Sequence, residues 1–145
     1  MSRSNVEVVR RVYELFRDGD TKAALEHLDE GIEWIVPPST SMEPATFVGH
    51  EGVLLDDERF RSAWREITVE VESLIDIGPF VVAYVCWSGT AKSADLPVTM
   101  RLGALWTFAD DKVVRHQHFP TGDAALDSVG SGPLRRRLAI RRRQS

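Results

Sequence analysis

The sequence has little of what would cross-link the chain, span a membrane or bind a nucleotide. Cys86 is the one cysteine among 145 residues, which excludes an internal disulfide and favours a reducing compartment. No run approaches the roughly 18 apolar residues of a membrane span, and the polar first residues lack an apolar signal region, so we expect a cytoplasmic protein without membrane contact. Because the sequence has no Gly-rich phosphate loop, Gly-x-Ser-x-Gly elbow or Cys-x-x-Cys pair, it does not support a nucleotide cofactor or a hydrolase nucleophile.

What the chain does have is the size and composition of one globular domain, with 43% apolar and 28% charged residues. The net charge of −4 is unevenly spread, because segment 133–145 carries six arginines and no acid, which leaves −10 for residues 1–132. An acidic body repels nucleic acid, so we expect none to bind there. We assign the domain to residues 1–130 and residues 131–145 to a basic, flexible tail, whose arginines could instead contact phosphates or a partner.

Hydrophobic spacing predicts three helices in the first half of the chain. The first covers about 5–18 and opens with Ser4 and Glu7, the two residues of a capping box. The second is short and ends at Gly31, because glycine readily adopts the left-handed conformation that closes a helix. The third covers 53–66.

Later segments change to a period of two, which predicts strands. The predicted strands are 32–36, 67–76, 80–91, 97–108 and 112–119. Segment 37–49 is rich in proline, serine and threonine and is long enough to be a functional loop, so we interpret it as a lid. Helices followed by an antiparallel meander favour an α+β fold, in which the sheet curls around the helices and leaves a pocket at its open end.

Several local patterns together resemble the SnoaL-like branch of the NTF2-like superfamily over about residues 5–130. The patterns are VRRVYELFRDGD at 9–20, FVGHEGV at 47–53, LWTF at 105–108, DKVV at 111–114 and AAL at 124–126. The resemblance implies an NTF2-like cone, with three N-terminal helices packed on a strongly curved, mostly antiparallel sheet. It also implies a small-molecule pocket and a homodimer formed through the outer face of the sheet. Function stays open, because this fold hosts isomerases, polyketide cyclases, epoxide hydrolases, dehydratases and binding proteins.

The carboxylates of two well-known activities of this fold are missing at the matching positions. The two carboxylate positions of ketosteroid isomerases fall at or near Val36 and Ala104, and neither residue can move a proton. The final-strand aspartate of limonene epoxide hydrolases corresponds to His118, and Gly103 stands where an aspartate should follow Arg101. Polyketide cyclases of this fold use a histidine with an acidic residue, for which the chain offers no evident acidic partner. We therefore do not expect the isomerase or hydrolase mechanism.

His116 and His118 are the best candidates for catalysis. Because they are two residues apart on a predicted strand, they share one face, and the resemblance makes it the face toward the pocket. Histidine can accept and return a proton near neutral pH. The pair could instead close the bottom of the pocket or lie at a dimer contact. We expect no metal site, because zinc needs more ligands than this pair and Cys86 is the one thiol.

Aromatic and apolar side chains would line the pocket if the helices pack over the concave face, although core packing is the commoner role for each. The candidate ligand-binding residues are Tyr13, Phe16, Trp34, Val36, Trp64, Phe80, Tyr84, Met100, Leu102, Ala104 and Trp106. We predict a protein that binds a small apolar organic ligand without a cofactor. If it is an enzyme, we expect acid–base chemistry of the cyclase, isomerase or dehydratase type on a hydrophobic carbonyl or polyketide-like substrate, with Tyr13 or Tyr84 positioning the carbonyl. The alternative is a non-catalytic ligand-binding or assembly protein.

Overall fold

The computed structural model describes residues 4–37 and 44–130. The helices are α1 (Asn5–Arg17), α2 (Thr21–Leu25), α3 (Gly49–Ala63) and α4 (Gly122–Val129). The strands are β1 (Leu28–Val36), β2 (Ala45–Val48), β3 (Trp64–Ile77), β4 (Phe80–Ala91), β5 (Leu96–Ala109) and β6 (Lys112–Phe119). None of these helices combines the length and the apolar character that crossing a bilayer requires. Part of the predicted lid and the basic tail lie outside the described residues.

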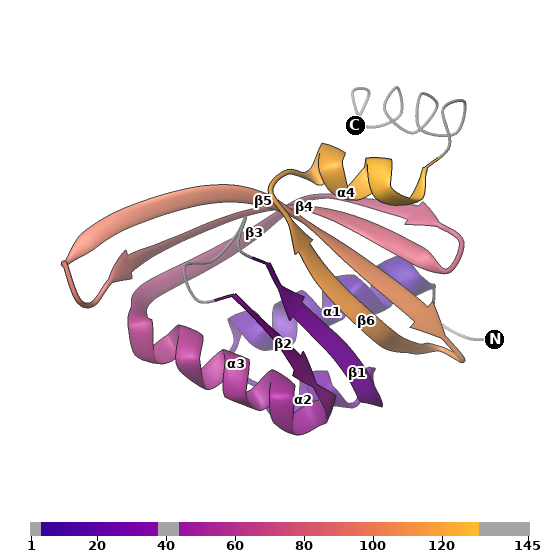
Figure 1. The fold of residues 1–145 in the computed structure, drawn as a ribbon, viewed down its shortest axis with the longest axis horizontal. Helices are drawn as coiled ribbons and strands as arrows, with labels where there is room; N and C mark the ends of the chain where they lie inside the picture. Colours follow the sequence, from indigo (N-terminus) through magenta and orange to yellow (C-terminus); the bar gives the residue numbers. More distant parts are fainter. Residues whose placement is uncertain (1–3, 38–43, 131–145) are drawn as a thin grey trace.

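The described strands form one curved sheet in the order β2-β1-β6-β5-β4-β3. Among the described strands, only β1 and β6 pair in parallel, and the other neighbouring strands are antiparallel. Helices α1, α2 and α3 lie on one side of the sheet, which we call the inner face, and α4 lies on the opposite, outer face (Figure 1). The predicted α+β class, with three early helices against a mostly antiparallel sheet, is therefore confirmed.

Helix α1 shows how the sequence directs a helix onto the inner face. The Ser4 side chain accepts a hydrogen bond from the backbone N–H of Glu7 at 3.2 Å, as the capping-box pattern predicts. The buried residues of this helix recur at helical spacing and are Val8, Val9, Val12 and Leu15. All of them join the inner core, so burial of one apolar stripe fixes which way α1 faces.

Three sequence predictions of element boundaries are wrong. Gly31 ends no helix, because α2 stops at Leu25 and β1 already contains Gly31, whose N–H is bonded to the Asp29 carboxylate at 2.8 Å. The segment predicted as a lid contains β2, which pairs with β1. Helix α3 begins at Gly49, with φ of 77°, and gives way to β3 at Trp64. The ends of α3 are hard to predict from the sequence because the helix is weakly amphipathic. Val53 is its one buried residue, so the apolar spacing gives little sign of where the helix begins and ends.

Alternation along the strands divides the apolar side chains between two cores. The inner core joins α1, α2 and α3 to β1, β4, β5 and β6 and includes both Trp34 and Trp106. The outer core joins α4 to the other face and consists of Ile75, Val82, Leu105, Ala125 and Leu126. Helix α4 approaches β5 so closely that a Cβ on Gly103 would lie 2.4 Å from the Thr121 carbonyl oxygen, so this position requires glycine.

Candidate functional site

His116 and His118 lie on β6 and face the inner side of the sheet. In the strand register, His116 pairs with Trp34 of β1 and with Trp106 of β5, whereas His118 pairs with Ala104. The two imidazole centroids are 4.8 Å apart, with the rings edge to face. The structure thus brings the two candidate histidines together among aromatic side chains. Within residues 4–37 and 44–130, no group of three His, Cys, Asp or Glu residues is placed to hold a metal ion.

The His116 ring is enclosed by two indoles. Its centroid lies 3.9 Å from that of Trp34, nearly parallel at 24°, and 4.3 Å from that of Trp106, tilted at 58°. Only 2% of the residue is exposed. Its Nδ1 atom is buried and has no hydrogen-bond partner in the part of the chain that the structure describes. Such unpaired buried groups are uncommon in native proteins and need an explanation.

Burial makes both histidines weak bases. It lowers the pKa of His118 from 6.5 to about 4, and it lowers the pKa of His116 well below 6.5, with the neighbouring His118 acting in the same direction. Both imidazoles are therefore neutral at pH 7. General-base catalysis works best when the pKa of the base lies near the working pH. The pair is better suited to hydrogen bonding with a ligand than to fast proton abstraction.

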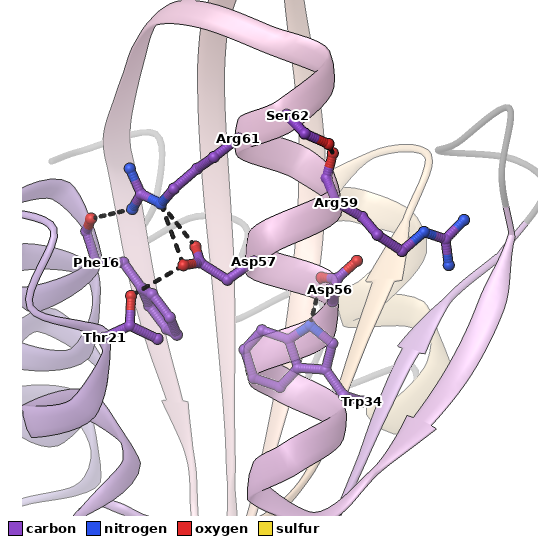
Figure 2. A network of polar contacts seen from close by, with 8 residues as sticks. All are labelled: Phe16, Thr21, Trp34, Asp56, Asp57, Arg59, Arg61 and Ser62. Carbon is purple, nitrogen blue, oxygen red and sulfur yellow. Dashed lines mark hydrogen bonds and ion pairs between the residues drawn. The ribbon is translucent and has the colours of Figure 1, made fainter.

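The two indoles that enclose His116 are held by the helices. The Trp34 Nε1–H donates to the Asp56 carboxylate on α3 at 2.9 Å (Figure 2). The Trp106 Nε1–H donates to the Tyr13 hydroxyl on α1 at 3.2 Å, and the two rings meet edge to face with centroids 5.3 Å apart. Helix packing therefore sets the orientation of both indoles, and through them the surroundings of the imidazole.

A groove of about 370 Å³ lies between α1 and the edge strand β3 and reaches Tyr13. Its lining consists of Arg10, Tyr13, Glu14 and Arg17 from α1 and Val69, Glu70, Val71 and Glu72 from β3. Burial raises the pKa of Tyr13 far above its ordinary value of 10.0, so the hydroxyl keeps its proton. The groove differs from the predicted apolar pocket, because charged side chains form much of its wall.

A family model describing a SnoaL-like domain matches residues 9–116. The chain belongs to the SnoaL-like domain family. The matched segment of this SnoaL-like chain begins at Val9 inside α1, covers α2 and α3 and ends at His116, so His118 and α4 lie beyond it. A comparison with curated proteins gave no match.

Several solved structures resemble this SnoaL-like chain over most of its length. An NTF2-like protein from Burkholderia thailandensis is 18% identical over 90% of this chain and 100% of its own, with a TM-score of 0.77. A candidate SnoaL-like polyketide cyclase from Jannaschia is 19% identical over 92% and 99%, with a TM-score of 0.69. TerC, co-crystallised with polyporic acid, is 21% identical over 83% and 93%, with a TM-score of 0.70. At these identities the likeness shows the fold alone.

Sequence reasoning missed Asp56. It begins an acidic run, Asp56-Asp57-Glu58, which is typical of a solvated helix face. Figure 2 shows the two aspartates turned to different partners, because Asp57 accepts from Arg61 at 3.0 Å and from Thr21 at 3.1 Å. The available signal was helical spacing, since Asp56 follows the buried Val53 by three positions and therefore faces the same side of α3.

Most of the predicted lining residues do gather on the inner face. Phe16 lies against Trp34, with ring centroids 6.0 Å apart. The others that belong to the inner core or pack against it are Tyr13, Val36, Met100, Leu102, Ala104 and Trp106. They pack against one another and against α1, so much of the predicted lining acts as core.

Phe80 and Tyr84 are not brought to this face, which corrects the prediction that they share a site with Trp106. Both pack against the outer core, because their places in the alternation of β4 point them toward α4. The Tyr84 hydroxyl donates to the Asp123 carboxylate at 2.7 Å. Trp64 lies at the start of β3, away from the imidazoles. Its ring packs edge to face against that of Trp87, with the ring centroids 5.0 Å apart.

Proposed function

We propose that this SnoaL-like protein binds a compact, largely apolar organic molecule between α1 and the inner face of the sheet, without a cofactor. The observation that carries the proposal is the buried hydroxyl of Tyr13, a residue that also lines the groove. Its oxygen accepts a hydrogen bond from the Trp106 indole, and it donates to no acceptor among the residues in the described ranges. A phenol in this state has its own O–H to offer to a ligand oxygen.

The aromatic side chains behind Tyr13, rather than the charged walls of the groove, favour a ligand with a flat, apolar body and an oxygen at one end. Aromatic rings stack readily on flat apolar molecules, and Trp106 lies directly behind Tyr13. Because the hydroxyl keeps its proton, it remains a hydrogen-bond donor across the physiological pH range. A carbonyl held by Tyr13 would be polarised, which is the assistance that isomerisation, cyclisation or dehydration requires.

The weak basicity of the histidines favours binding, or slow catalysis, over fast proton transfer. A neutral His118 can donate or accept one hydrogen bond beside a bound carbonyl, and at a pKa of about 4 it abstracts protons poorly at pH 7. The catalytic role of His116 and His118 therefore stays a proposal, secondary to ligand binding.

Calorimetric titration with polyporic acid tests the proposal, with the two tyrosines as a matched pair. Tyr13→Phe should bind about tenfold more weakly than the unaltered protein, because one hydrogen bond to the ligand is lost. Tyr84→Phe loses a hydroxyl on the outer face and should bind as the unaltered protein does. Equal affinity in all three proteins would contradict the role of Tyr13. No binding to the unaltered protein would remove this compound as a representative ligand and count against the proposal.

A homodimer through the outer face, a cytoplasmic location and an assembly role for the basic tail also stay proposals. The homodimer comes from the family resemblance, and the cytoplasmic location from the single cysteine and the lack of a long apolar run. The assembly role comes from segment 131–145, which lies outside the described residues. The outer face carries the Glu72–Arg101 ion pair, with N and O 3.2 Å apart, so a partner would meet charged as well as apolar side chains there.

A further inference from the structure

The unpaired Nδ1 of His116 is the least satisfied polar atom of the inner face. It is the one buried side-chain nitrogen or oxygen without a hydrogen bond among residues 4–37 and 44–130. Only 2% of the surface of His116 is exposed, and its ring packs between the indoles of Trp34 and Trp106. A phenylalanine ring at this position would leave no unpaired atom. Packing alone therefore does not account for an imidazole at this position.

The neighbours of the ring offer no partner for this nitrogen. Both indole N–H groups point elsewhere, since Trp34 donates to Asp56 and Trp106 donates to Tyr13. His118 contacts the ring edge to face instead of through a hydrogen bond. A metal ion would need further ligands, and the described residues place no such group there. A buried water or an oxygen of a bound organic molecule can fill this role, because neutral imidazole can either accept from a hydroxyl or donate to a carbonyl.

We propose that His116 Nδ1 hydrogen-bonds the deep end of the ligand, and that the ligand is a flat aromatic molecule with oxygens at both ends. This inference rests on the proposed function, in which Tyr13 holds the other end. Tyr13 and His116 contact the same indole, with ring centroids 5.3 and 4.3 Å from that of Trp106. A flat molecule lying along Trp106 would reach both groups.

Binding in this position must be accompanied by movement of the enclosing rings. The nitrogen is buried in the structure, so a ligand reaches it only when an indole shifts. Trp106 is the indole on the side of the groove, where Tyr13 holds its Nε1–H. Ligands that reach His116 should therefore change the tryptophan fluorescence more than ligands that stop at Tyr13.

Two probes that differ by one oxygen test the inference. 2,6-Dihydroxynaphthalene carries hydroxyls at opposite ends, and 2-naphthol carries one. The unaltered protein should bind the diol about tenfold more tightly, because the second hydroxyl gains a hydrogen bond to His116. His116→Phe should bind the two compounds equally, whereas Tyr84→Phe should keep the preference. His116→Phe should also melt at a higher temperature than the unaltered protein without ligand, because it removes an unpaired buried atom.

The outcomes separate the inference from the proposed function. Binding of both probes with no preference for the diol, or a preference that survives in His116→Phe, would overturn the role of His116 alone. A lower melting temperature for a folded His116→Phe protein would show that the imidazole is satisfied by the protein, which also overturns it. If neither probe nor polyporic acid binds, the proposed function fails and this inference fails with it.

Nitrogen NMR of the unaltered protein gives a readout that needs no variant. The chain has four histidines, so ¹⁵N-labelled imidazoles can be assigned individually. Saturating diol should shift the Nδ1 resonance of His116, and saturating 2-naphthol should shift it much less. The inference would be overturned if the two probes shifted the Nδ1 resonance of His116 equally, or if neither probe shifted it.

Discussion

The two faces of the sheet are built from the same strands but differ in chemistry. The outer core is aliphatic and is covered by α4, and its prominent polar contact is the Tyr84–Asp123 hydrogen bond. The inner core holds tryptophans, imidazoles and a tyrosine, linked by ring contacts and by hydrogen bonds to α1 and α3. An aliphatic core stabilises the fold, whereas polar aromatic groups in a core are costly unless they are paired. The contrast indicates that the outer face supports the fold and the inner face carries the function.

Gly103 gives the strongest way to damage the outer face without touching the inner one. Gly103→Ala should destabilise the protein by about 3 kcal/mol, because its Cβ would collide with the backbone of α4, where the Thr121 oxygen is 2.4 Å away. Urea unfolding measures this loss. Gly31→Ala is the control, since the nearest atom, an Asp29 carboxylate oxygen, is 3.4 Å away, and we expect a change below about 0.5 kcal/mol.

If the outer face only supports the fold, the folded Gly103→Ala protein should still bind ligand as the unaltered protein does. Titration with polyporic acid, under conditions where the variant remains folded, checks this. If affinity falls together with stability, the two faces are coupled, and the division into a supporting face and a functional face is wrong.

Acid should weaken the inner face through its histidines. The pKa of His118 is lowered on folding from 6.5 to about 4, so the folded state keeps the ring neutral where the unfolded chain binds a proton. Its contribution is fully present above pH 6.5 and is lost as the pH falls toward 4. We expect a loss on the order of 2 kcal/mol from this residue, allowing for its partial exposure. His116 shifts in the same direction.

Unfolding free energies measured by urea at several pH values between 4 and 7 check this prediction. His118→Phe should lose stability less steeply with falling pH than the unaltered protein. Asp56 acts in the opposite sense, because burial raises the pKa of its carboxyl above 3.8, but it is present in both proteins and cancels in the difference. Parallel pH profiles would mean that His118 titrates normally in the folded protein.

The sequence predicts the bounds of helices and strands well where strong local signals exist. The bounds of β4 and β6 agree with the predicted segments, because turn residues flank a strongly apolar run in β4 and precede β6. The N-terminal end of α1 follows from its capping box. Helix α3 was misplaced by several residues at each end, since a helix with a single buried residue leaves almost no periodic signal.

The site was harder to predict, for reasons that follow from particular residues. Spacing of two on a strand places His116 and His118 on one face, and register then places them beside the tryptophans. Phe80 and Tyr84 were assigned to the wrong face. Because α4 covers the outer face of β4, this strand carries apolar residues on both faces, and alternation cannot show which face is the inner one. The unpaired Nδ1 depends on contacts between distant segments, which no local pattern in the sequence contains.

Asp56 offers the smallest and most selective change to the inner face. Asp56→Ala should destabilise the protein by about 1–2 kcal/mol, because the buried Trp34 N–H loses its acceptor. Asp56→Asn keeps an oxygen in the same place and should recover at least half of that loss. Asp57→Ala is the neighbouring control, since Asp57 bonds Thr21 and Arg61 and does not contact the indole (Figure 2).

Tryptophan emission separates a specific effect on Trp34 from a general loss of stability. Asp56→Ala should change the emission of the folded protein, whereas Asp57→Ala should alter stability alone. Because Trp34 stacks on His116 at 3.9 Å, a looser indole should also weaken binding of the naphthalene diol in Asp56→Ala, and Asp56→Asn should restore it. Equal behaviour of the alanine and asparagine variants would show that the carboxylate does not position Trp34, and that packing on the sheet alone orients the rings around the imidazole.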